Sequence, residues 1–355
     1  MEVKEINGYS LLAPFQGKDA GFSRWTFGMR DGQWYFLKEF QDPKYPDETT
    51  LADGLRHNRI QECRDFEDSK VRMYHRLNQI SDGNVVRIAE VFRWNSHYYM
   101  ATRRIDGEKI PASELTRLPL LDRLLLCRTF AHALMKVHEA GIVHSDIKQS
   151  NVLLQKTATG RLTVKLIDFD AGFFEDSAPE EPEELNFDQS YLAPEGCLML
   201  LGEPANLTCK MDVFSAGLLM HEYLAGEFPH FDPMYSFAHE AVLDGQRLQL
   251  DPSLPYEIRQ LLERMLLGDP EERCSMADVY RELGVYFGNA SEEIPEVLVG
   301  EKEPVVIEDD PGTGGTTIKG PKKGPSGGRS RGPSKGPSTG PTKDPNDFFS
   351  KAGNL

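Results

Sequence analysis

The stretch from residue 142 to residue 170 constrains the fold of this chain more than any other. It begins IVHSDIKQSNVLL and ends LTVKLIDFD, so polar residues are bracketed by short β-rich runs. Asp146 precedes the run NVLL, Asn151 is the first residue of that run, and Asp168 lies at the end of the run that follows it. The pattern predicts a small hairpin that carries two acidic sites, with an amide oxygen and Lys148 between them.

These residue types indicate phosphoryl transfer. Mg²⁺ prefers hard oxygen ligands and usually keeps several waters, so one aspartate with one asparagine suits a metal bridged to a nucleotide. A second aspartate, offset from the metal pair, could accept a hydrogen bond from a substrate hydroxyl. A neighbouring lysine could neutralise a transferring phosphoryl group.

Outside this stretch, the sequence pattern changes near residue 118 from mostly strand-like to mostly helical. Before it, aromatic and polar residues alternate around Asp31-Gly32, which predicts a hairpin, and the runs VVRIAEVFRW and HYYMATRRI predict two more strands. A charged segment over residues 48–80 has apolar residues at helical spacing, which predicts one long helix. After it, helical periodicity dominates, over Leu118–Ile142, Val213–Leu224, Tyr256–Leu267 and Met276–Phe287.

Composition narrows the class of protein. The chain has 355 residues, of which 39% are hydrophobic, enough for a sizeable core. Its 56 acidic against 40 basic residues make it a poor candidate for coating nucleic acid or an anionic membrane. Five widely spaced cysteines without a C-x-x-C pair argue against a disulfide scaffold or a zinc site. Without a signal peptide or an apolar span, we expect a cytoplasmic protein.

The last 45 residues differ from the rest. Residues 311–355 contain 11 Gly and 7 Pro and carry a net charge of +6, so we expect them to be disordered. They are open to three interpretations: a plain tether, a weak nucleic-acid contact, or a substrate of the chain's own site. The third rests on hydroxyls beside basic residues, namely Ser326, Ser330, Ser334, Ser338 and Thr342.

Six ordered motifs resemble those of the protein kinase superfamily, of the serine/threonine type, over roughly residues 10–290. They are YFLK with Lys38, HSDIKQSN, DFD, LAPE with Glu195, DVFSAG with Asp212, and DPEERCS with Arg273. The resemblance implies a bilobal α+β fold with an N-lobe at 1–106, a C-lobe at 107–292 and a linker and tail at 293–355. The stretch YFLKEFQDPKYPD suggests a eukaryotic-like (Hanks-type) kinase of bacterial origin.

The resemblance also implies roles for single residues, with ATP and Mg²⁺ (or Mn²⁺) as cofactors. Asp146 would orient the substrate hydroxyl and accept its proton, and Lys148 would stabilise the phosphoryl group. Asn151 and Asp168 would hold the metal. The implied nucleotide contacts are Gly17, Gly21, Lys38, Thr102, Arg103 and Asp106, with Glu67 as the helix acid that pairs with Lys38; Asp68 and Glu62 fit that place almost as well. His144, Glu195, Asp212 and Arg273 would brace the site.

The chain departs from the family pattern in several places. The glycine loop keeps only Gly17 and Gly21, with Ser23 where the last glycine is expected. Ser145 replaces the catalytic-loop arginine, so activity is not expected to depend on activation-loop phosphorylation. Asp170 replaces the glycine of D-F-G, and Asp188 replaces a threonine.

These departures leave rival interpretations open. The main expectation is phosphorylation of serine and threonine in proteins. The substrates considered include basic protein segments and the chain's own tail. The rival is a pseudokinase that binds nucleotide weakly and acts as a scaffold or allosteric partner. A small-molecule kinase of the aminoglycoside-phosphotransferase type shares part of the metal motifs but not the A-P-E, DVFSAG and Arg273 elements.

Overall fold

The computed structural model describes residues 5–17, 23–47, 53–107, 110–157, 160–180 and 188–290, and two short strands at 306–308 and 317–319. The chain divides into two units, Met1–Pro321 and Lys322–Leu355, and the fold below is that of the first. Gly21, the segment 181–187 and the serines and threonine of the tail lie outside the described residues.

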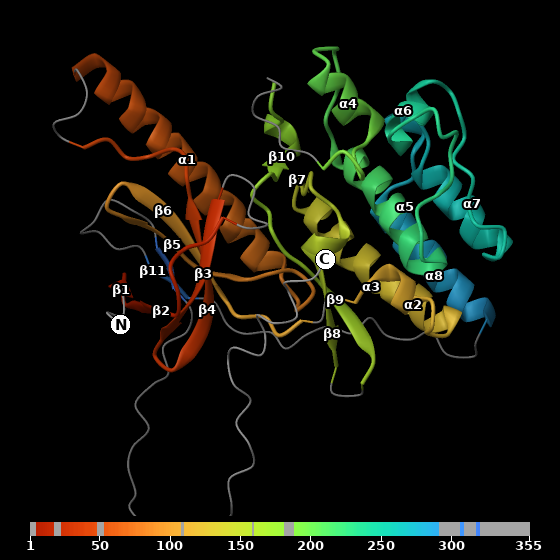
Figure 1. Ribbon diagram of the computed structural model, residues 1–355, viewed down its shortest axis with the longest axis horizontal. Coiled ribbons are helices and arrows are strands. Elements are labelled where there is room, and N and C mark those ends of the chain that lie inside the picture. Colours follow the sequence, from red (N-terminus) through yellow and green to blue (C-terminus); the bar gives the residue numbers. More distant parts are fainter. Residues whose placement is uncertain are drawn as a thin grey trace, which may run out of the picture. The chain divides into compact units, whose positions relative to one another are not determined.

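A six-stranded antiparallel sheet forms the N-terminal part (Figure 1). Its strand order is β1-β2-β3-β4-β6-β5, and the bounds are β1 Glu5–Ile6, β2 Tyr9–Leu11, β3 Ser23–Arg30, β4 Gln33–Phe40, β5 Ile88–Trp94 and β6 His97–Arg103. Asp31 and Gly32 connect β3 to β4 with φ angles of 52° and 72°. Positive φ at both turn residues is what a two-residue hairpin of this hand needs, so the predicted hairpin is confirmed.

Aromatic side chains stabilise this sheet on both faces. One buried cluster contains Tyr9, Leu37 and Tyr99, with Phe92 packed against it. On β3, Trp25 packs against Phe27 and Phe36, with ring centroids 5.7 Å apart in each case. The other two tryptophans, Trp34 on β4 and Trp94 on β5, are partly exposed.

A single long helix accompanies the sheet, as predicted: α1 runs from Asp53 to Ile80 (Figure 1). Its buried side chains follow a stripe at helical spacing, with Cys63, Met73, Tyr74 and Leu77 almost fully buried. Phe66 lies on the same stripe and packs against Phe40 of β4. The helix is therefore held against the sheet by its apolar face.

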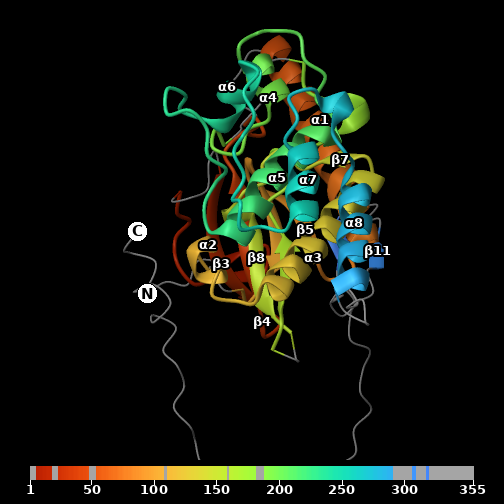
Figure 2. The same ribbon diagram turned by 90° about the vertical axis from the view of Figure 1, so that its right-hand side faces the viewer.

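The C-terminal part is mostly helical, and α5 lies among α3, α7 and α8 (Figure 2). The helices are α2 Ala112–Leu115, α3 Leu120–Glu139, α4 Pro194–Leu200, α5 Cys209–Ala225, α6 Ala238–Leu243, α7 Tyr256–Met265 and α8 Met276–Ala290. Nearly every residue of α5 is buried, so it forms the centre of this part. The predicted helices around residues 118–142, 213–224, 256–267 and 276–287 are confirmed. No helix in the described part of the chain is long and apolar enough to cross a membrane.

Three small antiparallel pairs complete the described structure. β7 Ile142–Val143 pairs with β10 Phe173–Phe174, and β8 Val152–Lys156 pairs with β9 Leu162–Leu166. β11 Val306–Glu308 pairs with β12 Thr317–Lys319. The hairpin of β8 and β9 is the one predicted from NVLL and LTVKLIDF. The polar residues of interest lie at its open end, before β8 and after β9.

Candidate active site

The two small strand pairs position a loop and a segment opposite each other. The loop, residues 144–151, runs from the end of β7 to the start of β8 and closes with a 3₁₀ turn at Gln149–Asn151. The segment that starts at Asp168 leaves β9 and returns to pair with β7. Ser145 and Asp168 have φ angles of 62° and 64°, an uncommon conformation for residues other than glycine.

Asp212 at the start of α5 holds the loop from beneath. Its side chain is 1% exposed, and its two oxygens accept hydrogen bonds from the backbone N–H groups of His144 (2.7 Å) and Ser145 (2.8 Å). Nε2 of His138 lies 3.0 Å from the same carboxylate. A buried carboxylate with two backbone donors fixes the loop rigidly, which agrees with the bracing place expected for Asp212.

His144 connects the loop to the segment after β9. Its Nε2 donates to the carbonyl oxygen of Ile167 (3.1 Å), and its ring packs on Phe169 with centroids 4.4 Å apart. Because a carbonyl can only accept, this contact fixes the proton on Nε2. Ser145 adds a second connection, since its hydroxyl donates to the carbonyl of Ala171 at 2.6 Å. These two hydrogen bonds and the ring contact therefore fix the position of the loop relative to the segment after β9.

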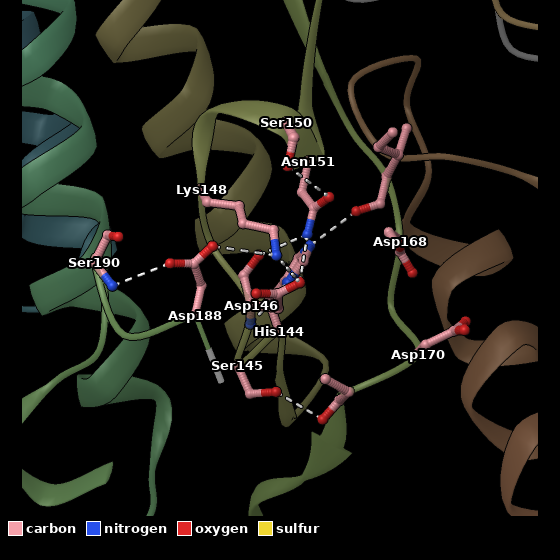
Figure 3. A network of polar contacts seen from close by, with 12 residues as sticks. His144, Ser145, Asp146, Lys148, Ser150, Asn151, Asp168, Asp170, Asp188 and Ser190 are labelled. Carbon is pink, nitrogen blue, oxygen red and sulfur yellow. Dashed lines mark hydrogen bonds and ion pairs between the residues drawn. The ribbon is translucent and has the colours of Figure 1, made fainter. Parts of the chain in front are cut away.

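Asp146, Lys148 and Asn151 form one cluster (Figure 3). Oδ2 of Asp146 lies 2.8 Å from Nδ2 of Asn151 and 3.0 Å from Nζ of Lys148. Nδ2 of Asn151 also donates to the backbone oxygen of Asp146 at 2.9 Å. Burial raises the pKa of Asp146 above its usual range, although Lys148 acts in the opposite direction. The sequence prediction that these three residues act together is consistent with this geometry.

Lys148 has a second carboxylate beside it. Nζ lies 3.5 Å from Asp188, the residue that stands where the family has a threonine. Although burial favours the neutral amine, Asp146 and Asp188 hold the pKa of Lys148 above its usual range. The backbone N–H of Ser190 donates to Asp188 at 3.0 Å, which orients that side chain toward the cluster (Figure 3).

Lys38 reaches the site from β4. Its Nζ makes ion pairs with Asp168 (2.8 Å) and Asp170 (2.7 Å), and the side chain is only 5% exposed. Burial alone would lower the pKa of Lys38, but the two carboxylates raise it above its usual range. The prediction that Lys38 and Asp168 belong to the same site agrees with this contact.

The expected pair between Lys38 and an acid of the helix is wrong for this structure. Glu67 lies near Arg93, and its pKa is raised mainly by burial. Glu62 pairs with Arg59 instead, at 2.8 Å. The physical reason is the direction of the helix: the stripe that faces the site carries Phe66 and Tyr74, and Glu67 projects to one side of it.

The residue of α1 that does reach the site is Lys70, which the sequence reasoning missed. Nζ of Lys70 donates to the backbone oxygen of Asp170 at 2.8 Å, and burial lowers the pKa of the amine. The sequence does contain a signal for this placement. Lys70 lies four residues after Phe66 and three before Met73, which puts it on the apolar stripe of α1. Burial alone would raise the pKa of Asp170, but Lys38 and Lys70 hold it below its usual range.

The residues expected around a nucleotide base lie at the end of β6 and beyond it. Thr102 is buried between Phe36 of β4 and Ile88 of β5. Arg103 is exposed, and the Asp106 carboxylate pairs with Arg104 at 3.3 Å. Gly17 is exposed in the connection between β2 and β3, next to Gln16, which bridges to Trp25 of β3. Apart from its two chain neighbours, no atom lies within 4 Å of the place of its missing Cβ.

Glu195 and Arg273 form a buried ion pair away from the chemistry. The two guanidinium nitrogens lie 2.6 and 2.8 Å from the two carboxylate oxygens, in a bidentate arrangement. Arg273 has 0% side-chain exposure and Glu195 4%. The pairing implied by the resemblance is present, and it joins the start of α4 to the turn before α8.

The fold and the site define a protein kinase, and comparison with known families agrees. Residues 44–283 match the family described as protein kinase domain. That match covers more than half of the chain, so the chain belongs to the protein kinase family.

Several curated relatives that the chain resembles are serine/threonine kinases. The chain is 30% identical over 200 residues to serine/threonine-protein kinase ULK3 of Xenopus laevis, covering 55% of this chain and 41% of the relative. Against ULK3 of Homo sapiens it is 28% identical over 236 residues, 66% of this chain and 43% of the relative. Against serine/threonine-protein kinase zyg-8 of Caenorhabditis elegans it is 27% identical over 235 residues, 62% and 28% of the two chains.

The chain thus spans less than half the length of these curated relatives. All three relatives are eukaryotic, so they give no support to the expectation of a bacterial origin.

Proposed function

We propose that this chain is an ATP-dependent kinase that phosphorylates serine and threonine hydroxyls of proteins. The observation that carries the proposal is the cluster of Asp146, Lys148 and Asn151 beside Asp168, which is ion-paired to Lys38. One carboxylate is left to a substrate, one to a metal, and two lysines lie where phosphate charge would be neutralised. This is the set of groups that phosphoryl transfer needs.

In this proposal Asp146 orients the substrate hydroxyl and accepts its proton. Its contact with Lys148 opposes the rise in pKa that burial causes, and the hydrogen bond from Asn151 orients its carboxylate. Lys148 stabilises the negative charge that builds up on the phosphoryl group during transfer. Lys38 contacts the α and β phosphates, and Thr102, Arg103 and Asp106 line the base, with Gly17 and Gly21 in the loop over the phosphates.

The donor set fits a divalent metal bridged to nucleotide. Asn151 uses its NH₂ group twice on Asp146, which leaves its amide oxygen for a cation. Asp168 binds Lys38 through Oδ1 alone, which leaves a second hard oxygen. In the described part of the chain no group of three or more acidic, histidine or cysteine side chains could hold a metal by itself. Mg²⁺ (or Mn²⁺) held by Asn151, Asp168 and nucleotide phosphates would neutralise phosphate charge.

The setting of the proposed enzyme follows from its charge and its thiols. The body of the chain is acidic and all five cysteines are free, which favours a reducing, cytoplasmic compartment and basic protein segments as substrates. The chain's own basic tail, 311–355, is a candidate substrate. We assign the N-lobe to 1–106, the C-lobe to 107–292 and the linker and tail to 293–355.

The test is transfer of the γ-phosphate of ATP by the wild type and by Asp146→Asn. Both are incubated with Mg²⁺ or Mn²⁺, and labelled sites are mapped by mass spectrometry on the chain and on a basic test protein. We expect serine and threonine labelling that the variant lacks, at unchanged melting temperature and ATP affinity. Asp146→Asn removes the proton acceptor and one of the two carboxylates beside Lys148, and it keeps the shape of the side chain, so loss of the fold or of ATP affinity would point to a different role.

Two results would contradict the proposal. Equal labelling by wild type and variant would remove Asp146 from the reaction. No labelling with either metal, together with measurable ATP binding, would leave a nucleotide-binding scaffold instead.

A further inference from the structure

Asp170 is the side chain on which the two lobes meet at this site. Its Oδ2 lies 2.7 Å from Nζ of Lys38 on β4 and 3.2 Å from the hydroxyl of Ser23 at the start of β3. Its backbone oxygen accepts from Nζ of Lys70 on α1 at 2.8 Å. In Figure 3 the Asp170 carboxylate points away from Asp146 and toward the ribbon of α1.

Lys38 needs more than one counter-charge at this place. Its side chain is almost fully buried, and an unpaired buried ammonium is strongly unfavourable. Asp168 supplies one carboxylate, but that residue is also the proposed metal ligand. Asp170 supplies the other at a slightly shorter distance, so it can hold Lys38 while Asp168 turns to a metal.

No acid of α1 competes for this role in the described helix, Asp53–Ile80. Lys38 makes its ion pairs with Asp168 and Asp170 alone among the described residues. The helix instead presents Lys70, whose Nζ lies 5.9 Å from the ring centroids of Phe40 and Phe66. The helix thus contributes a positive charge where a negative one was expected.

The four charges balance. Lys38 and Lys70 carry two positive charges, and Asp168 and Asp170 carry two negative ones, within one chain of contacts. Removing Asp170 alone would leave one carboxylate, that of Asp168, for the two lysines. Changing Lys70 alone to an acid would bring a third carboxylate to the same place. Either single change therefore disturbs the balance, to a net charge of +1 without Asp170 and −2 with an acid at position 70. The joint change leaves a net charge of −1, but it again gives Lys38 two carboxylates, that of Asp168 and that at position 70.

We propose that Asp170 is the positioning residue that holds Lys38, and that it acts as one half of an exchanged charge pair whose other half is Lys70 on α1. The inference rests on the function proposed above and deepens it. Asp170 acts through Lys38 rather than on the substrate. Ser23 and Lys38 contact the carboxylate of Asp170 and Lys70 contacts its backbone oxygen, so β3, β4 and α1 all meet the segment after Asp168 at this one residue.

The test is a cycle of variants: Asp170→Gly, Lys70→Glu, and the two combined. Asp65→Asn, an exposed acid on the same helix, is the matched control. Each protein is assayed for kcat and for KM of ATP, and for the affinity of Mg²⁺-ADP by calorimetry. Asp170→Asn serves as a near-isosteric second variant, and melting temperatures show that each protein is folded.

We expect each single variant to lower kcat/KM for ATP, and to weaken Mg²⁺-ADP binding, by about tenfold or more. The combined variant, which places an acid on the helix, should recover to within about threefold of wild type. A residue that only stabilises the fold would not be rescued by a second change that removes another native contact. Asp65→Asn should match the wild type in every measurement.

Several results would overturn the inference. One is a combined variant as weak as the product of the two single effects; another is an Asp170→Asn protein with wild-type kcat/KM and affinity. A large loss in Glu67→Gln would restore the helix acid as the partner of Lys38. If the wild type transfers no phosphate, the proposed function fails, and the same cycle in Mg²⁺-ADP affinity still decides the inference.

Discussion

Replacing Glu195 by glutamine should destabilise the C-terminal helical part strongly. Arg273 uses all five of its N–H groups: two on Glu195, and one each on the backbone oxygens of Leu267, Lys210 and Gly268. Glu195→Gln replaces one carboxylate oxygen by an NH₂ group that cannot accept, and it leaves a buried cation without its counter-charge. Breaking a buried pair in this way costs about 3–5 kcal/mol.

The assay is urea unfolding followed by far-ultraviolet circular dichroism, which reports the helices. With an m-value of about 3 kcal/mol/M for a domain of this size, the midpoint should fall by more than about 1 M. The control is Glu282→Gln, which breaks a surface pair with Arg264 and should cost about 0–1 kcal/mol.

The pairwise part is isolated by combining Glu195→Gln with Arg273→Met. The second change removes the stranded charge, so we expect a coupling energy of about 2 kcal/mol. The reasoning is refuted if Glu195→Gln costs no more than Glu282→Gln, because the pair would then owe nothing to its burial.

Three further changes test other parts of the structure. Asp212→Asn leaves one of two buried loop N–H groups without an acceptor and should cost about 1–3 kcal/mol in the same urea assay. Gly172→Ala places a Cβ 3.0 Å from the carbonyl oxygen of Val143, and overpacking against backbone should cost about 1–3 kcal/mol. Burial lowers the pKa of His221, whose Nε2 accepts the backbone N–H of Asp251 at 3.0 Å, so its stabilising effect is complete above about pH 6.5 and is lost as the pH falls below it. The melting temperature should drop further between pH 8 and pH 5.5 in the wild type than in His221→Gln; equal drops would count against this.

Local patterns were enough to predict the elements. The Asp31-Gly32 turn and the two strand runs after α1 depend on neighbours in the sequence, and so do the periodic helices. The resemblance supplied the loop with Asp146, because spacing within one short segment survives where the overall identity to relatives is low. These predictions required no knowledge of which distant residues meet.

The contacts that Asp170 makes with Lys38 and Lys70 could not be predicted from local sequence patterns. The contact between Lys70 and Asp170 joins residues 100 positions apart, and no local pattern encodes it. The family pattern directed attention to an acid on the helix, and Glu67 lies only three residues from Lys70. What decided the outcome was the rotation of α1 set by Phe66 and Met73, which brings position 70 and not 67 to the site.

The distribution of tryptophan gives the protein an optical label on one side only. Trp25, Trp34 and Trp94 are the three tryptophans of the chain, and all belong to the N-terminal sheet. Indole emission therefore reports on β3, β4 and β5, while the helices around α5 emit through tyrosine alone. An emission change at constant helical ellipticity would locate an event in the sheet, such as ligand binding beside β3, without any added fluorophore.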